Sequence, residues 1–184
     1  MKKRTKVGEW KTVFKGEFFQ IEQAPAVFSS GKKITFERAW RPASVIVLAF
    51  NEKKELILTR EFRSKSGKYE WMLPAGKADG GGTPLSDARR ELQEETGFKA
   101  KNIKLFHKSD SSTILNWVHY TFIASGLTYE PIETHEDEDI TVISMSLEKA
   151  YNMVIEGKIL NDWIAYMISR AYWEKEKIFK ILKI

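Results

Sequence analysis

The chain contains no cysteine and no long hydrophobic run, and both absences exclude whole classes of protein. Without cysteine there is no disulfide framework, thiol nucleophile or zinc–thiolate site. No apolar stretch approaches the roughly 20 residues that span a bilayer. None follows the basic residues at the start of the chain, as it would in a secretory signal. We therefore expect a cytoplasmic protein without a membrane partner.

The composition that remains is typical of a folded domain. The 184 residues are 42% hydrophobic and 12% aromatic, enough to bury the core of one domain, or of one domain with a small appendage. The net charge of +5 gathers at the two ends of the chain, as in solvated termini, whereas residues 130–139 hold six carboxylates. Charge alone therefore does not indicate a nucleic-acid partner.

Strand patterns dominate the first half of the chain and recur in the second. Alternating or continuous apolar segments predict strands near residues 10–14, 18–21, 33–36, 44–50, 55–62, 69–73, 103–108, 117–125 and 140–145. Helical patterns cover residues 84–96, 147–157 and 161–177. The predicted fold class is α+β, with helices packed against a sheet.

The segment 84–96 has the clearest helix signals and carries three glutamates. Thr83 suits the N-cap, and Gly97 suits the position after the last turn. On a helical projection Glu91 and Glu95 lie about 100° and about 60° from Leu92, on the same side, and Glu94 lies further toward solvent. Carboxylates at this density suit Mg²⁺ or Mn²⁺, which bridge protein oxygens to substrate phosphates. The alternative is a solvated acidic face.

The surroundings of this helix decide between these interpretations. Residues 76–98 resemble the Nudix hydrolase signature, and eight of its nine defined positions match in register. The matching residues are Gly76, Arg90, Glu91, Leu92, Glu94, Glu95, Gly97 and Phe98. The family's first glutamate falls on Gly82. We expect this departure to affect loop rigidity and metal affinity rather than the reaction class.

Further segments are similar to the branch of ADP-ribose and nucleoside-diphosphate-sugar pyrophosphatases. Residues 71–76 look like its Trp-Glu-Leu-Pro-Ala-Gly segment, with Met72 in place of the glutamate. Residues 60–63 resemble its Arg-Gln-Tyr-Arg strand, and 136–140 its acidic loop. This resemblance implies a mixed sheet between helices (43–184) and an N-terminal antiparallel β subdomain (1–42) that is exchanged across a homodimer.

The resemblance also implies roles for individual residues. Glu91, Glu94, Glu95 and the Ala75 carbonyl would bind Mg²⁺ or Mn²⁺, and Arg90 in the catalytic set would orient the carboxylates. Glu138, or else Glu136, would be the general base that accepts a proton from water.

Four residues are expected to contact the substrate. Arg63, with Arg60, would bind phosphate, although an ion pair of Arg63 with a nearby acid is an equal alternative. Phe14 and Trp40 would offer aromatic faces to a nucleobase, although such side chains are more often part of the core.

The implied reaction is hydrolysis of the pyrophosphate bond of ADP-ribose or a nucleoside diphosphate sugar, which yields a nucleoside monophosphate and a sugar phosphate. Two alternatives stay open within the enzyme class, namely hydrolysis of nucleoside triphosphates and removal of pyrophosphate from RNA 5′ ends. A third alternative is a non-catalytic module that senses nucleotides.

Overall fold

The protein consists of two compact units. The computed structural model describes residues 5–64, 66–79, 81–110, 114–132 and 140–184. Unit 1 comprises residues 1–43 and 109–118, and unit 2 comprises residues 44–108 and 119–184. Residues 109–118 thus group with the N-terminal segment, which the sequence pattern does not indicate.

Unit 1 is built around an antiparallel sheet. Its strands are β1 (Lys6–Val7), β2 (Lys11–Lys15), β3 (Gln20–Val27), β4 (Lys33–Trp40) and β10 (Leu115–Asn116). The long pair β3–β4 runs antiparallel over its full length, β1 and β2 pair with β3, and β10 adds to β4 in parallel. The strands that alternation predicts near residues 10–14, 18–21 and 33–36 are therefore present, and they pair antiparallel as the resemblance implies.

Among the residues that the structure describes, unit 2 holds two sheets and all of the helices. Its strands are β5 (Ser44–Ala49), β6 (Glu55–Arg63), β7 (Lys68–Met72), β8 (Ala75–Lys77), β9 (Phe98–Asp110), β11 (Val118–Tyr129) and β12 (Ile140–Ser146). One sheet has the order β8-β5-β11-β9, with β5 and β11 parallel and β8 antiparallel to β5. The other is the antiparallel sheet β12-β6-β7.

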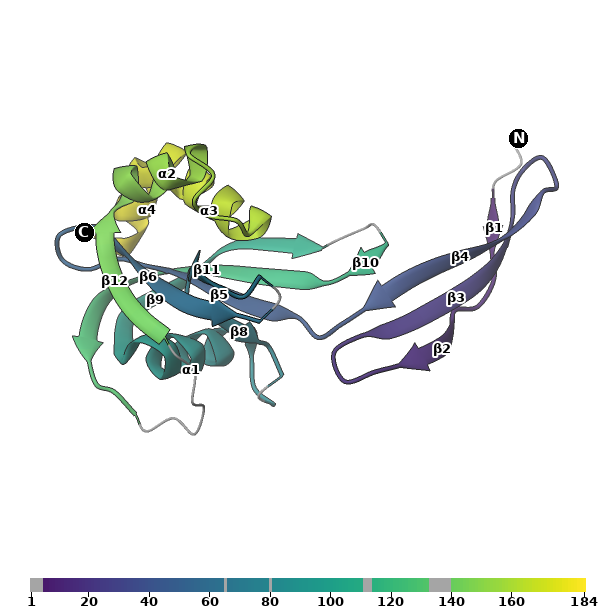
Figure 1. Cartoon of the computed structure of the whole chain (residues 1–184), viewed down its shortest axis with the longest axis horizontal. Helices are drawn as coiled ribbons and strands as arrows, with labels where there is room; N and C mark the ends of the chain where they lie inside the picture. The colour runs from purple at the N-terminus through teal and green to yellow at the C-terminus, as the bar shows by residue number, and fades with distance from the viewer. Residues whose placement is uncertain (1–4, 65, 80, 111–113, 133–139) are drawn as a thin grey trace. The chain divides into compact units, whose positions relative to one another are not determined.

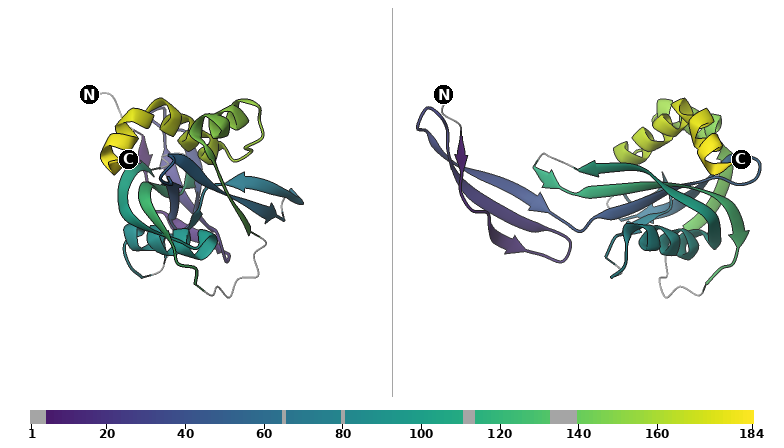
Figure 2. Two further views of the ribbon diagram at one scale, coloured as in Figure 1. Left: turned by 90° about the vertical axis from the view of Figure 1, so that its left-hand side faces the viewer. Right: turned by 180° about the vertical axis from the view of Figure 1, so that it is seen from behind.

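Helices lie on both sides of the mixed sheet (Figures 1 and 2). They are α1 (Pro84–Thr96), α2 (Leu147–Ile155), α3 (Asp162–Trp173) and α4 (Lys175–Leu182). On β5, Val45 and Val47 pack with Leu92 of α1, whereas Ile46 and Leu48 belong to the cluster that contains α2, α3 and α4. A continuous apolar strand buried on both faces explains this three-layer arrangement, and the expected mixed sheet between helices is confirmed.

The C-terminal helical segment differs from the sequence expectation of one helix over residues 161–177. Asn161 caps α3, which ends at Trp173, and α4 begins at Lys175. Glu174 between them leaves helical geometry, with φ −99° and ψ 13°. This break lets Ile178 and Leu182 become fully buried. Burial of apolar side chains outweighs the continuous helical pattern here. In the described part of the chain, no helix is long and apolar enough to cross a membrane.

Candidate active site

Helix α1 presents its acidic side toward the interior of unit 2. Thr83 accepts a hydrogen bond from the Ser86 amide, and the Ser86 hydroxyl accepts one from the Thr83 amide, so the first turn has a reciprocal cap. Leu85, expected on the buried stripe, is 40% exposed. Asp87 and Glu91 are buried instead, beside Ala88 and Leu92. The helix is therefore rotated so that carboxylates share the buried face with aliphatic side chains.

The three glutamates of the signature are held by different partners. The Arg90 guanidinium donates to Glu91 at 2.6 Å and to Glu94 at 2.5 Å. Glu95 accepts a hydrogen bond of 3.0 Å from the Ala75 amide. Partial burial disfavours the charged form of Arg90 and by itself would lower its pKa. The negative charges and hydrogen bonds of Glu91 and Glu94 have the larger combined effect, so the pKa of Arg90 is raised. Arg90 thus stays cationic and holds two of the acids in place.

Gly76 lies directly against the Glu91 carboxylate. A Cβ added at residue 76 would overlap the carboxyl carbon and both oxygens of Glu91. The adjacent Ala75 amide binds Glu95, so strand β8 contacts two of the three glutamates from one side. The Glu91 carboxylate therefore occupies space that is free only because residue 76 has no side chain.

These residues fit a hard divalent cation by donor type. Carboxylate and carbonyl oxygens are the ligands that Mg²⁺ and Mn²⁺ prefer. Within the described residues, however, no three acidic or histidine side chains converge into a ready-made metal cluster. The reason is visible in the contacts: Arg90 bridges Glu91 and Glu94, and Glu95 turns toward the Ala75 amide. The structure thus brings the predicted donors to one helix flank without joining them around one point.

The two arginines expected to bind phosphate lie on β6 and have different surroundings. Arg63 forms an ion pair of 2.7 Å with Glu61. The sequence left this pairing open as an alternative. Arg60 is exposed, and its guanidinium lies 5.7 Å from the ring centroids of both Tyr69 and Trp71. Arg63 is thereby fixed by a charge, whereas Arg60 is held by aromatic faces.

The remaining predicted residues lie elsewhere. The candidate bases Glu136 and Glu138 are outside the described residues. Phe14 and Trp40 belong to unit 1, where they are 58% and 41% exposed. Burial in the core was the alternative to nucleobase contact for these two residues. Neither of them is buried in the part of the chain that the structure describes.

Sequence reasoning missed two polar groups in unit 2. Glu61 is a buried carboxylate within a strand. Its only sequence signal is a charged residue three positions after Leu58, the last residue of the buried apolar run of β6. His107 accepts a hydrogen bond of 2.7 Å from Arg170, and its ring lies 5.8 Å from the Trp163 ring. Burial, followed by the nearby Arg170 charge, lowers the pKa of His107, with Glu174 opposing. Sixty-three residues separate this pair, so no local motif reveals it.

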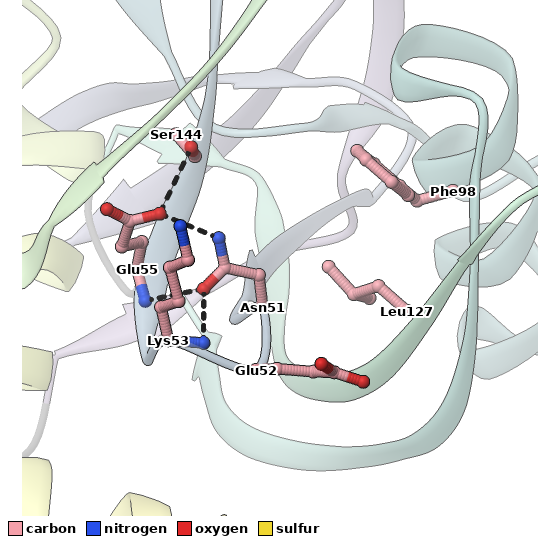
Figure 3. A pocket seen from close by; sticks show the side chains of 7 residues that line it. All are labelled: Asn51, Glu52, Lys53, Glu55, Phe98, Leu127 and Ser144. Atoms are coloured by element: carbon pink, nitrogen blue, oxygen red, sulfur yellow. Dashed lines mark hydrogen bonds between the residues drawn. The ribbon is translucent and has the colours of Figure 1, made fainter.

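A surface pocket of about 370 Å³ opens at the turn between β5 and β6, with its polar and apolar lining residues drawn in Figure 3. Asn51 donates to Glu55 at 2.8 Å and accepts from the Glu55 and Lys53 amides, and Ser144 donates to Glu55. Phe98 and Leu127 form the apolar part of the lining. Since these polar groups bind one another and no α1 glutamate lines the pocket, the pocket belongs to the turn between β5 and β6 rather than to the acidic site.

Comparison with known proteins identifies the family. The model of the NUDIX domain matches residues 40–164. The chain is 30% identical over 159 residues to an ADP-ribose pyrophosphatase of Bacillus subtilis (strain 168), an alignment that covers 85% of this chain and 86% of that protein. It is 25% identical over 153 residues to a methanol dehydrogenase activator of Bacillus methanolicus, with 82% and 83% covered.

A solved structure has the same fold. The crystal structure of an ADP compounds hydrolase superposes with a TM-score of 0.80 at 24% identity, and the match covers 95% of this chain and 96% of that one. The matched family region contains β5, β6, β8 and all of α1, the elements that carry the acidic site. The chain therefore belongs to the Nudix family and is a Nudix pyrophosphohydrolase.

Proposed function

We propose that this enzyme hydrolyses the pyrophosphate bond of ADP-ribose or a nucleoside diphosphate sugar, and that it uses Mg²⁺ or Mn²⁺. The observation that carries the proposal is the signature helix, whose buried Glu91 fits against Gly76 while Glu95 binds the Ala75 amide. The name of the Bacillus subtilis relative supports ADP-ribose as the first substrate to test.

The proposed roles follow from charge and position. Glu91, Glu94, Glu95 and the Ala75 carbonyl would hold the cation, which when bound supplies charge neutralisation to the diphosphate and lowers the pKa of a bound water. Arg90 forms ion pairs with both Glu91 and Glu94, so these carboxylates are held on one flank of the helix before the substrate arrives. Arg63 and Arg60 would contact phosphate oxygens, since a guanidinium fork matches them. A carboxylate of Glu138, or of Glu136, would take the proton from the attacking water.

A substrate panel tests the reaction. ADP-ribose, GDP-mannose, UDP-glucose, dinucleotides, nucleoside triphosphates and a 5′-triphosphorylated RNA are incubated with Mg²⁺. A coupled phosphatase reports the monoester products, and pyrophosphate is measured in parallel. We expect ADP-ribose or a nucleotide sugar to be turned over fastest. Turnover confined to triphosphates or RNA would contradict the substrate class, and nucleotide binding without turnover would indicate a sensor.

Substitutions test the proposed metal ligands. We expect Glu95→Gln, Glu91→Gln and Glu94→Gln each to lower turnover by orders of magnitude, because a neutral amide is a poor ligand for a hard cation. Glu148→Gln removes an exposed helix carboxylate as a matched control. Mn²⁺ binding, followed by electron paramagnetic resonance, gives a readout that does not depend on turnover. A variant that binds Mn²⁺ like the wild type is removed from the ligand set.

The homodimer, the cytoplasmic location and the roles of residues 1–42, including nucleobase contact by Phe14 or Trp40, stay predictions. Light scattering after size exclusion tests the first: a homodimer has twice the chain mass of 21.3 kDa. For the aromatic rings, Phe14→Ala and Trp40→Ala should raise KM for a nucleotide sugar more than for the isolated sugar diphosphate.

A further inference from the structure

Glu61 is a buried carboxylate in a part of β6 where its neighbours are exposed. Its residue is 6% exposed, whereas Arg60, Phe62 and Arg63 on either side are exposed. Burial of a carboxylate costs free energy unless hydrogen bonds and an opposite charge replace water. Its cross-strand neighbour on β7 is Glu70, a second acid, and like charges in that position destabilise a strand pair. Sheet stability by itself therefore does not account for a glutamate here.

The two oxygens of Glu61 are bound by different partners. Oε1 accepts a hydrogen bond from the hydroxyl of Thr59, a residue with no exposed surface. Oε2 forms the 2.7 Å ion pair with Nη2 of Arg63. The carboxylate is thus fixed from the interior by Thr59 and holds Arg63 on its outer side. This is the arrangement expected of a group whose task is to set the position of a guanidinium.

Arg63 keeps most of its donors for another ligand. Its side chain is 44% exposed, and Glu61 is its only side-chain partner in the described part of the chain. A guanidinium has five N–H donors, so one ion pair leaves a fork that can bind an anion. Strand alternation puts Thr59, Glu61 and Arg63 on the same face of β6 as Ile57, which packs in the cluster of Leu92 on α1. Arg63 therefore extends from the same face of β6 whose Ile57 shares an apolar cluster with Leu92 of the signature helix.

We infer that Glu61 is a positioning residue that holds the Arg63 guanidinium ready for a phosphate group of the substrate. This inference rests on the proposed function and deepens it. Glu61 does not touch the substrate; it reduces the freedom that Arg63 loses on binding. Preorganisation of a flexible side chain increases affinity without altering the chemical step. The role of Glu61 therefore belongs to binding and predicts an effect on KM rather than on kcat.

Glu61→Gln is the decisive substitution. The glutamine oxygen can accept from Thr59 or from Arg63, but its amide nitrogen donates and cannot bind a guanidinium. With ADP-ribose as the probe, we expect KM in Mg²⁺, and Kd by calorimetry in EDTA, to rise about tenfold, with kcat changed less than about twofold. Glu70→Gln removes an equal charge from the opposite position and should leave both constants within about twofold of the wild type.

Two further comparisons separate positioning from folding. Thr59→Val removes the hydroxyl that holds Oε1 and should raise KM, whereas Thr59→Ser keeps that hydroxyl and should restore it. In an Arg63→Ala background, Glu61→Gln should have no further effect on KM, because the two residues act through one contact. The inference is overturned if Glu61→Gln has the Kd and KM of the wild type, or if the effects of Glu61→Gln and Arg63→Ala on KM are fully additive. Either result leaves the proposed function untouched. Absence of turnover and binding in the wild type overturns the proposed function as well.

Discussion

The Ser86 hydroxyl occupies the space into which a side chain at Gly82 would project. A Cβ at residue 82 would overlap Ser86 Oγ, the atom that accepts a hydrogen bond from the Thr83 amide. The family signature has a glutamate at this position. The side chain of a glutamate here and the Ser86 hydroxyl that caps α1 would occupy the same space, so the chain can have only one of them in this conformation. The start of the helix is held by Thr83 and Ser86 rather than by a glutamate.

Restoring the family's glutamate should therefore destabilise this chain. We expect Gly82→Glu to displace Ser86, open the reciprocal cap and lower the free energy of unfolding by about 1 kcal/mol. In a Ser86→Ala background the same change should cost much less, because the cap is already lost. Urea unfolding of the four proteins measures the coupling, and equal costs in both backgrounds would contradict the competition.

A methyl group at residue 76 should disable the site. Gly76→Ala introduces a Cβ where the Glu91 carboxylate lies, so Glu91 or strand β8 must move. A displacement on the order of 1 Å costs about 100-fold in turnover. Asp79→Ala, at an exposed residue three positions further along, serves as the control. Steady-state assays with ADP-ribose compare the two variants, and a Gly76→Ala enzyme with wild-type turnover would show that Glu91 does not need this space.

The cap of α3 should have a measurable effect on stability. The Asn161 side chain accepts hydrogen bonds of 3.0 and 3.1 Å from the Trp163 and Ile164 amides. We expect Asn161→Ala to cost about 1 kcal/mol and to lower Tm by about 3 °C. Asn161→Asp keeps an accepting oxygen and should stay close to the wild type. Calorimetry provides the comparison; an alanine variant as stable as the aspartate variant would contradict a capping role.

Stability should fall at mildly acidic pH because of His107. Burial and Arg170 lower its pKa in the folded state below the ordinary value of 6.5. At a pH between the folded-state and the unfolded-state pKa, the unfolded chain binds more protons than the folded chain. The free energy of unfolding therefore rises with pH, and the contribution of His107 to it is lost as pH falls below about 6.5. Urea midpoints at pH 7.5, 6.5 and 5.5 measure the slope.

The matched variant for this effect is His107→Gln, which can still accept a hydrogen bond from Arg170 but does not titrate. Its urea midpoint should depend less on pH over the same range than that of the wild type. If the two proteins lose stability in parallel, another group is responsible for the slope.

Much of the fold and of the reacting helix follows from the sequence because the signals are local. The Thr83 cap, the Gly97 terminus and the spacing of Glu91, Glu94 and Glu95 define α1 within about 15 residues, and the structure has that helix at residues 84–96. The apolar run of β5 likewise predicts a strand covered on both faces. The family signature rests on the same short segment, so it needs no knowledge of distant contacts.

Contacts between distant residues required the tertiary structure. The burial of Glu61 depends on its partners in the β12-β6-β7 sheet, and the contact of His107 with Arg170 joins residues 63 positions apart. The inward turn of Asp87 and Glu91, in place of Leu85, depends on how α1 packs beneath β5. Local patterns fix which residues form an element, because backbone hydrogen bonds and periodic burial are short-range. Which side chains lose their water, and which charges then meet, is decided only when the elements pack together.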